Sequence, residues 1–289
     1  MNAPAARHRT NPDSQRMLLT RVITALCLLL LILPILFLAP PAALAGLMAV
    51  IVALAAWEFG RLLGLRGAGP WFYAIACVVA MIAWHDLPAR GAMLWLLQAS
   101  VVAWGVAIVL LARGVRKATP AFAIVAGLVG LVILPAFGHA AMLLRGLGVG
   151  VLLSAAALVW AADIGAYFVG KAIGRRKLAP SISPGKSWEG AIGGWLFALA
   201  VALSLAATHA FAPTWFDRVA DRNGLLMVAL LTTLMVIASV VGDLFESLLK
   251  RQVGKKDSSR LLPGHGGVLD RIDALLPVLP LAALLILYL

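Results

Sequence analysis

Residues 247–273 of the chain read SLLKRQVGKKDSSRLLPGHGGVLDRID, and residues 239–246 directly before them read SVVGDLFE. Six Lys and Arg side chains are interleaved in the longer stretch, and the sequence on either side is apolar. Of the 12 acidic residues in the whole chain, five fall within these two short stretches: Asp243, Glu246, Asp257, Asp270 and Asp273. Because charges are costly to keep in an apolar chain, this cluster is the first candidate for a functional site.

The composition of the chain is that of a membrane protein. Of its 289 residues, 63% are hydrophobic and 12% are charged, and the mean hydropathy is +1.00. Such values are typical of several bilayer spans and exclude a water-soluble globular domain. The formal net charge is +12. The basic residues gather in short loops between apolar runs, which indicates membrane topology and argues against a nucleic-acid partner.

Nine apolar segments predict an all-α, polytopic integral membrane protein with about nine transmembrane helices. Within these runs we expect Cys27 and Cys77 to be small buried side chains. Glu58, beside Trp57 at the end of the second run, is interpreted as an interfacial anchor. The third run is short for a span. The nine runs cover residues 22–38, 42–59, 71–84, 92–111, 121–144, 149–170, 188–207, 225–246 and 268–289.

The distribution of Lys and Arg predicts the orientation of the chain in the membrane. If the N-terminus is cytosolic, 19 of the 24 basic residues fall on the cytosolic side. The positive-inside rule therefore predicts a cytosolic N-terminus. Those basic residues lie in the tail 1–21 and in the segments 60–69, 112–119, 171–187 and 247–266.

Four polar residues form a stripe on the eighth predicted helix. Ser239, Asp243, Glu246 and Lys250 are spaced by four, three and four residues, so they share one helix face. An unpaired Asp at the centre of a span costs about 2.5–3.5 kcal/mol on insertion scales, so these carboxylates need cations or water. One interpretation is a salt-bridge network between helices. The interpretation we favour is a site for a hard divalent cation, which binds oxygen ligands.

The turn at residues 263–267 places a histidine between two acidic helix ends. The glycines around His265 predict a backbone that turns sharply and approaches a ligand closely. Asp270 and Asp273 follow with the same i, i+3 spacing as Asp243 and Glu246. These two pairs could hold one or two metal ions between them. For His265 itself, a turn residue and a site residue are equally good interpretations.

A second candidate region covers residues 163–190. Asp163, Tyr167 and Lys171 lie on one face of the sixth predicted helix. The segment from Ser183 to Ser187, which contains Lys186, opens a helix and offers N–H groups, hydroxyls and an ammonium group to phosphate. The spacing of a P-loop is absent. Taken alone, this region is better explained as an ordinary basic loop.

Together, the two regions indicate an enzyme that joins two phosphorylated anions, one of them a lipid. A nucleoside triphosphate and a lipid phosphate repel each other. Mg²⁺ on the carboxylates, with Lys and Arg around it, would offset this repulsion and stabilise charge on the leaving pyrophosphate.

The signature from Ser247 to Asp273 resembles that of the phosphatidate cytidylyltransferases, also called CDP-diacylglycerol synthases. The elements that carry the resemblance are Lys250-Arg251, the Lys-Asp pair at 256–257, and Pro-Gly-His-Gly-Gly-Val-x-Asp-Arg-Ile-Asp at 263–273. The segments 163–174 and 183–190 are similar to further blocks of the family, whereas the N-terminal spans resemble it only in hydropathy. Two positions depart from the pattern: Gly185 stands where a second lysine is common, and Ser187 where threonine is usual.

The resemblance implies transfer of CMP from CTP to phosphatidate, giving CDP-diacylglycerol and pyrophosphate, with Mg²⁺ as cofactor. It implies a homodimer with its active site at the cytosolic face of a bacterial inner membrane. The apolar runs, the basic loops and the signature divide the chain into a basic tail (1–21), N-terminal helices (22–148) and a catalytic transmembrane region (149–289) with cytosolic loops 171–187 and 247–266. The implied residues are Asp243, Lys250, Asp257, His265 and Asp270 for catalysis; Asp163, Lys171, Ser183, Lys186, Arg251, Lys256 and Arg271 for substrate binding; and Asp243, Glu246, Asp270 and Asp273 for the metal.

Two alternative functions stay open. A cation- or proton-coupled transporter would also use intramembrane carboxylates, but it predicts acids near the bilayer midplane, whereas these lie at cytosolic helix ends. A related CTP-using enzyme, either a lipid-alcohol kinase or a synthase acting on an ether lipid, would share most of the chemistry. The signature favours the cytidylyltransferase.

Overall fold

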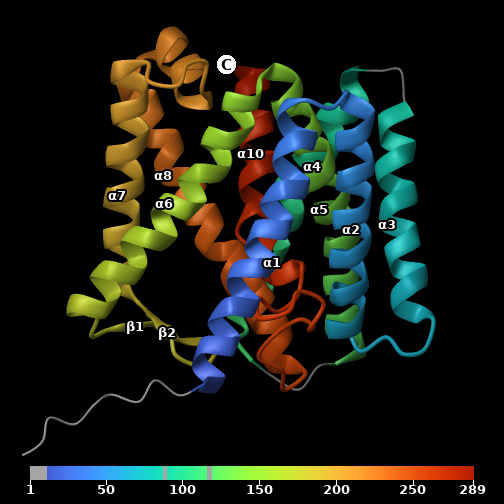
Figure 1. Cartoon of the computed structure of the whole chain (residues 1–289). Coiled ribbons are helices and arrows are strands. Elements are labelled where there is room, and N and C mark those ends of the chain that lie inside the picture. Colours follow the sequence, from blue (N-terminus) through green and yellow to red (C-terminus); the bar gives the residue numbers. More distant parts are fainter. Residues whose placement is uncertain (1–11, 87–89, 116–118) are drawn as a thin grey trace, which may run out of the picture.

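The computed structural model describes residues 12–86, 90–115 and 119–289, and these form a bundle of long helices with one small hairpin (Figure 1). A helix lies in each of the nine apolar runs, so the predicted all-α class is confirmed. The helices are α1 (Pro12–Phe37), α2 (Pro41–Leu62), α3 (Gly69–Asp86), α4 (Arg90–Ala112), α5 (Pro120–Leu147), α6 (Val149–Ile173), α7 (Trp188–Thr208), α8 (Trp215–Gln252), α9 (Leu269–Ile272) and α10 (Leu275–Tyr288).

Within the described residues, seven helices are long and apolar enough to cross a bilayer. These are α1, α2, α4, α5, α6, α7 and α8. Two shorter apolar helices, Gly69–Ala83 within α3 and Leu275–Tyr288, lie at the third and ninth predicted runs. The polytopic character of the chain is therefore confirmed, while the number of crossings and the orientation of the N-terminus stay predictions.

One end of the bundle collects the segments that the sequence assigns to the cytosolic side. Figure 1 shows α1 beginning at this end, together with the α2–α3 turn, the hairpin after α6 and the loop between α8 and α9. The connection from α7 to α8 and the end of α10 lie at the other end. We refer to the first as the hairpin end. Its basic segments thus share one side of the bundle.

The segment 171–187 is more ordered than the loop that the sequence predicts. Helix α6 continues to Ile173, and the chain then forms strands β1 (Lys177–Ala179) and β2 (Ser183–Ser187), which pair antiparallel. Lys177 pairs with Ser187, and Ser187 then caps α7 by accepting a hydrogen bond from Gly190 N at 3.1 Å. The expectation that this segment opens a helix is confirmed.

The ends of the two C-terminal helices differ from the prediction. The α8 helix begins at Trp215, where Thr214 and Asp217 form a capping box, and it is interrupted at Gly224, whose φ of 76° favours glycine. The predicted ninth run is divided into α9 and α10, with a break at Asp273 and Ala274. Asp270 therefore lies within α9, whereas Asp273 is the residue that ends it.

Helices α6 and α7 pack closely along their length because small residues meet between them. A side chain at Gly194 would collide with the carbonyl of Ala162, and one at Gly165 would collide with Phe197 and with the Gly193 carbonyl. This packing fixes the hairpin at the end of the helix pair. Elsewhere, Cys77 is buried as expected, but the expectation for Cys27 is wrong, because its side chain is exposed on α1.

Candidate active site

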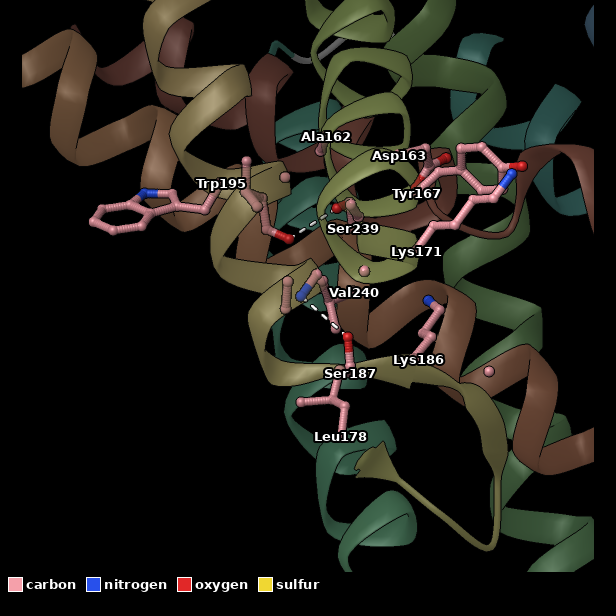
Figure 2. A pocket seen from close by; sticks show the side chains of 17 residues that line it. Ala162, Asp163, Tyr167, Lys171, Leu178, Lys186, Ser187, Trp195, Ser239 and Val240 are labelled. Carbon is pink, nitrogen blue, oxygen red and sulfur yellow. Dashed lines mark hydrogen bonds between the residues drawn. The ribbon is translucent and has the colours of Figure 1, made fainter. Parts of the chain in front are cut away.

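A cavity of about 360 Å³ lies between α6, β2, α7 and α8 near the hairpin end. Asp163 and Lys171 from α6, Lys186 from β2 and Ser239 from α8 all line it. Figure 2 shows Lys171 and Tyr167 beside each other at one edge, with Asp163 next to them and Trp195 at the opposite edge. The Lys171 ammonium lies 5.7 Å from the centroid of the Tyr167 ring. Two separate candidate regions of the sequence therefore face one cavity.

The hairpin is held to α7 by an acid that the sequence analysis did not use. The Glu189 carboxylate accepts hydrogen bonds from Arg175 N at 3.1 Å and from Arg176 N at 3.2 Å. These bonds tie the chain that leaves α6 to the start of α7. The position of Lys186 between them is thereby fixed.

Lys186 joins the cavity to the acidic stripe on α8. Its Nζ lies 2.5 Å from Asp243 Oδ2, and both side chains are partly buried. The other oxygen, Asp243 Oδ1, accepts a hydrogen bond from Ser247 Oγ at 3.3 Å. An ammonium that lines the cavity thus neutralises a carboxylate of the neighbouring cluster.

Lys250 connects α8 to α9. Its Nζ lies 2.5 Å from Glu246 Oε2 and 2.7 Å from Asp270 Oδ1, and only 12% of the lysine side chain is exposed. Glu246 is also buried, and its Oε1 atom has no hydrogen-bond donor. The predicted helix face is confirmed, and the carboxylates on it are paired with lysines.

Asp270 accepts more hydrogen bonds than any other acid of the cluster. Its Oδ2 atom accepts hydrogen bonds from Ser258 N at 3.0 Å, Ser258 Oγ at 2.8 Å and Gly267 N at 2.8 Å. Burial opposes ionisation, but the nearby Glu246 and Lys250 side chains and the Gly267 N–H outweigh it and lower the pKa of Asp270 to about 2. Asp270 is therefore an anion held by one oxygen, with the other oxygen turned to Lys250.

Asp273 has the opposite electrostatic environment. Burial, together with the nearby Asp243 carboxylate, raises the pKa of Asp273 to about 7. Its Oδ1 atom accepts a hydrogen bond from Ala274 N at 2.8 Å, at the break between α9 and α10. A cation placed beside Asp273 would favour its ionised form.

The donor chemistry of this cluster fits a hard divalent cation. Asp243, Glu246, Asp270 and Asp273 offer only oxygen atoms, and Glu246 Oε1 is buried without a donor. As the side chains stand, no three acids, histidines or cysteines of the described residues are grouped closely enough to hold a metal. The lysines neutralise the acids instead, so a metal would have to displace them. The metal assignment stays a prediction.

The two arginines predicted to bind substrate, Arg251 and Arg271, hold loops in this structure. Arg251 donates to Ile182 O at 3.2 Å and to Lys255 O at 3.3 Å. Arg271 donates to the main-chain oxygen of His265 at 2.9 Å and 2.5 Å. These bonds fix the signature turn. The Nδ1 atom of His265 is buried and has no hydrogen-bond partner.

Three predicted site residues neither line the cavity nor bond to the acidic cluster. Lys256 and Asp257 are exposed on the loop that joins α8 to α9. Ser183 begins β2, where it pairs with Ala179 and does not line the cavity. The structure thus brings together the acidic stripe, α9 and Lys186, but not these three side chains.

The interpretation of Glu58 as an interfacial anchor is wrong, and its role in the structure was not predicted. The side chain is fully buried, with 0% exposure, at the end of α2. It accepts hydrogen bonds from Ser258 Oγ at 3.0 Å, Ser259 Oγ at 2.5 Å, Val268 N at 3.0 Å and Leu269 N at 2.6 Å. A lone acid in an apolar run was the available signal, since such residues usually face a protein interior.

Comparison with known proteins places this chain in a family. The model of the cytidylyltransferase family matches residues 19–289. The phosphatidate cytidylyltransferase of Pseudomonas aeruginosa is 42% identical over 281 residues, which are 93% of this chain and 97% of the relative. The enzyme of the same name from Haemophilus influenzae is 55% identical over 125 residues, which are 43% of this chain and 41% of the relative. The chain belongs to the cytidylyltransferase family, and the similarity also extends over the N-terminal helices.

Proposed function

We propose that this chain transfers CMP from CTP to phosphatidate, giving CDP-diacylglycerol and pyrophosphate for phospholipid synthesis. The assignment of CTP and phosphatidate as substrates is supported by the relatives named phosphatidate cytidylyltransferase. The observation that carries the proposal is the 2.5 Å contact between Lys186 and Asp243, because it links a cavity lined by cations to a cluster of carboxylates. A triphosphate needs the cations, and its metal ion needs the carboxylates.

The reaction requires no protein nucleophile. A phosphate oxygen of phosphatidate attacks the α-phosphorus of CTP, the bond to the β-phosphate breaks, and pyrophosphate leaves with both electrons of that bond. A lipid phosphate is already ionised near neutral pH, so no strong base is needed. Lys171 and Lys186 bind the triphosphate, and Lys250 supports the carboxylates.

The proposal also covers the metal ion, the location of the site at the membrane and the oligomeric state. Mg²⁺, held by Asp243, Glu246, Asp270 and Asp273, would neutralise phosphate charge and stabilise the leaving pyrophosphate. We further propose that the hairpin end faces the cytosol at a bacterial inner membrane, which agrees with the basic segments gathered there. We propose a homodimer as the working form.

The test uses purified protein in detergent micelles that contain phosphatidate and Mg²⁺. Pyrophosphate release is followed with CTP and, in parallel, with ATP. Release that needs CTP, phosphatidate and Mg²⁺ supports the proposal. Release of nucleoside diphosphate on replacing phosphatidate by a lipid alcohol would indicate a kinase instead. No release from folded, lipid-loaded protein would overturn the proposal and favour a transporter.

A further inference from the structure

A buried carboxylate outside the acidic cluster contacts the signature loop. Glu58 comes from α2, whereas its four donors come from residues 258–269, about 200 positions later in the chain. Burial of an ionised carboxylate is costly unless charge-assisted hydrogen bonds replace the lost water. Here two hydroxyls and two main-chain N–H groups supply those bonds. The acid is therefore satisfied only while the loop keeps this conformation.

The same loop orients Asp270. The Ser258 hydroxyl lies 3.0 Å from Glu58 Oε2 and 2.8 Å from Asp270 Oδ2. Because a hydroxyl has one proton, it donates to one of these oxygens at a time, and it links the two carboxylates. The Ser258 N–H adds a second bond to Asp270 Oδ2. The position of Asp270 thus depends on a serine that Glu58 holds.

The contacts between Glu58 and the loop require a glycine at position 267. A side chain at Gly267 would collide with Ser258 Oγ and with both carboxylate oxygens of Glu58. Gly267 N also donates to Asp270 Oδ2 at 2.8 Å. One residue without a side chain therefore lets Glu58 and Asp270 approach the loop from its two sides.

We propose that Glu58 is a positioning residue for the reaction: it fixes the loop 258–269 and thereby holds Asp270 in its working orientation. The expected fall in turnover rests on the proposed function. The statement that Glu58 holds the loop 258–269 does not. Glu58 does not line the cavity, and its carboxylate oxygens bond to the loop. Its loss should lower turnover while leaving nucleotide binding by Lys171 and Lys186 unchanged, because that part of the cavity belongs to α6 and β2.

The main variant is Glu58→Gln, which keeps the size of the side chain but turns an NH₂ group toward donors. We expect kcat to fall about 10–100-fold, as for the loss of outer partners that orient a ligating side chain. The KM for CTP should stay within about twofold of the unaltered enzyme. Hydrogen exchange of the Val268 and Leu269 amides, measured by mass spectrometry without substrates, should accelerate.

The matched control is Asp217→Asn, at the opposite end of the bundle. Asp217 is also a buried acid, and it accepts hydrogen bonds from Thr214 N and Thr214 Oγ at 2.7 Å. Its replacement should lower the unfolding temperature without changing kcat or the exchange of residues 258–269. This control separates a general loss of stability from the specific effect at Asp270.

Ser259→Ala is the milder variant and is used if Glu58→Gln does not fold. It removes one donor to Glu58 and should shift kcat and loop exchange in the same direction by smaller factors. Unchanged kcat in folded Glu58→Gln protein, or a KM for CTP that rises in proportion to the fall in kcat, would overturn the proposal. If the unaltered protein releases no pyrophosphate, the proposed reaction fails, and the exchange measurement still decides whether Glu58 holds the loop.

Discussion

Lys250 on α8 lies between two carboxylates that belong to different helices, 2.5 Å from Glu246 and 2.7 Å from Asp270. The three side chains are largely buried, so water screens them little. A single ammonium thus neutralises two acids and joins α8 to α9. In a site that binds a metal, this ammonium is the counter-ion that the metal would replace.

Replacing Lys250 by methionine should destabilise the protein. The change leaves Glu246 and Asp270 without their cation, and breaking a buried ion pair typically costs about 3–5 kcal/mol. We expect a lower unfolding temperature in detergent without divalent ions. Because Mg²⁺ can then neutralise the acids, it should raise the unfolding temperature of this variant more than that of the unaltered protein.

The control for this experiment is Lys177→Met, which removes an exposed ammonium from the hairpin end. Its unfolding temperature should be close to that of the unaltered protein, since exposed charges contribute little. Equal stability of Lys250→Met and Lys177→Met would contradict the role given to Lys250.

Asp243→Asn should abolish most of the turnover and leave membrane insertion intact. The change removes the negative partner of Lys186 and one proposed metal ligand, so a loss of about 100-fold or more is expected. Insertion should not suffer, because a neutral side chain is easier to place in a bilayer. Pyrophosphate release and membrane fractionation measure the two effects. Near-normal turnover with Mg²⁺ would show that Asp243 is not a metal ligand.

The two lysines of the cavity should differ in their effect on CTP. Lys171 is exposed at the edge, so Lys171→Ala should raise the KM for CTP by about fivefold, equivalent to about 1 kcal/mol. Lys186 is partly buried, so Lys186→Ala should raise it by about 10–100-fold. Initial rates at varied CTP and fixed phosphatidate give both values. An unchanged CTP dependence in Lys171→Ala would make its segment an ordinary basic loop.

Gly194→Val should separate α6 from α7 and reduce activity without touching a charged group. The added side chain collides with the Ala162 carbonyl, and overpacking of this kind typically costs about 1–3 kcal/mol. The hairpin that positions Lys186 depends on this helix pair, so the KM for CTP should rise as well. Gly105→Val on α4, where an added Cβ has no atom within 4 Å, is the control. Equal stability and KM in both variants would argue against this packing role.

The sequence predicted the helices and the signature well because both depend on local patterns. Apolar runs and i, i+3 or i, i+4 spacings are visible without tertiary contacts, so the face shared by Asp243, Glu246 and Lys250 was predictable. Contacts between segments that are far apart in the sequence were not predictable in this way. Neither the pairing of Lys186 with Asp243 nor the burial of Glu58 follows from periodicity. The β1–β2 hairpin was missed because its Ser, Pro, Gly and Lys residues have low strand propensity.

The long separation between Glu58 and its donors also has a consequence for biosynthesis. Helix α2 emerges from the ribosome about 200 residues before Ser258 and Ser259. Until the loop arrives, this acid lacks its four hydrogen-bond donors, and an unpaired charge inside the bilayer is costly. The order of synthesis therefore makes completion of the active site one of the last events of assembly. A chain that stops before residue 258 never gains these donors.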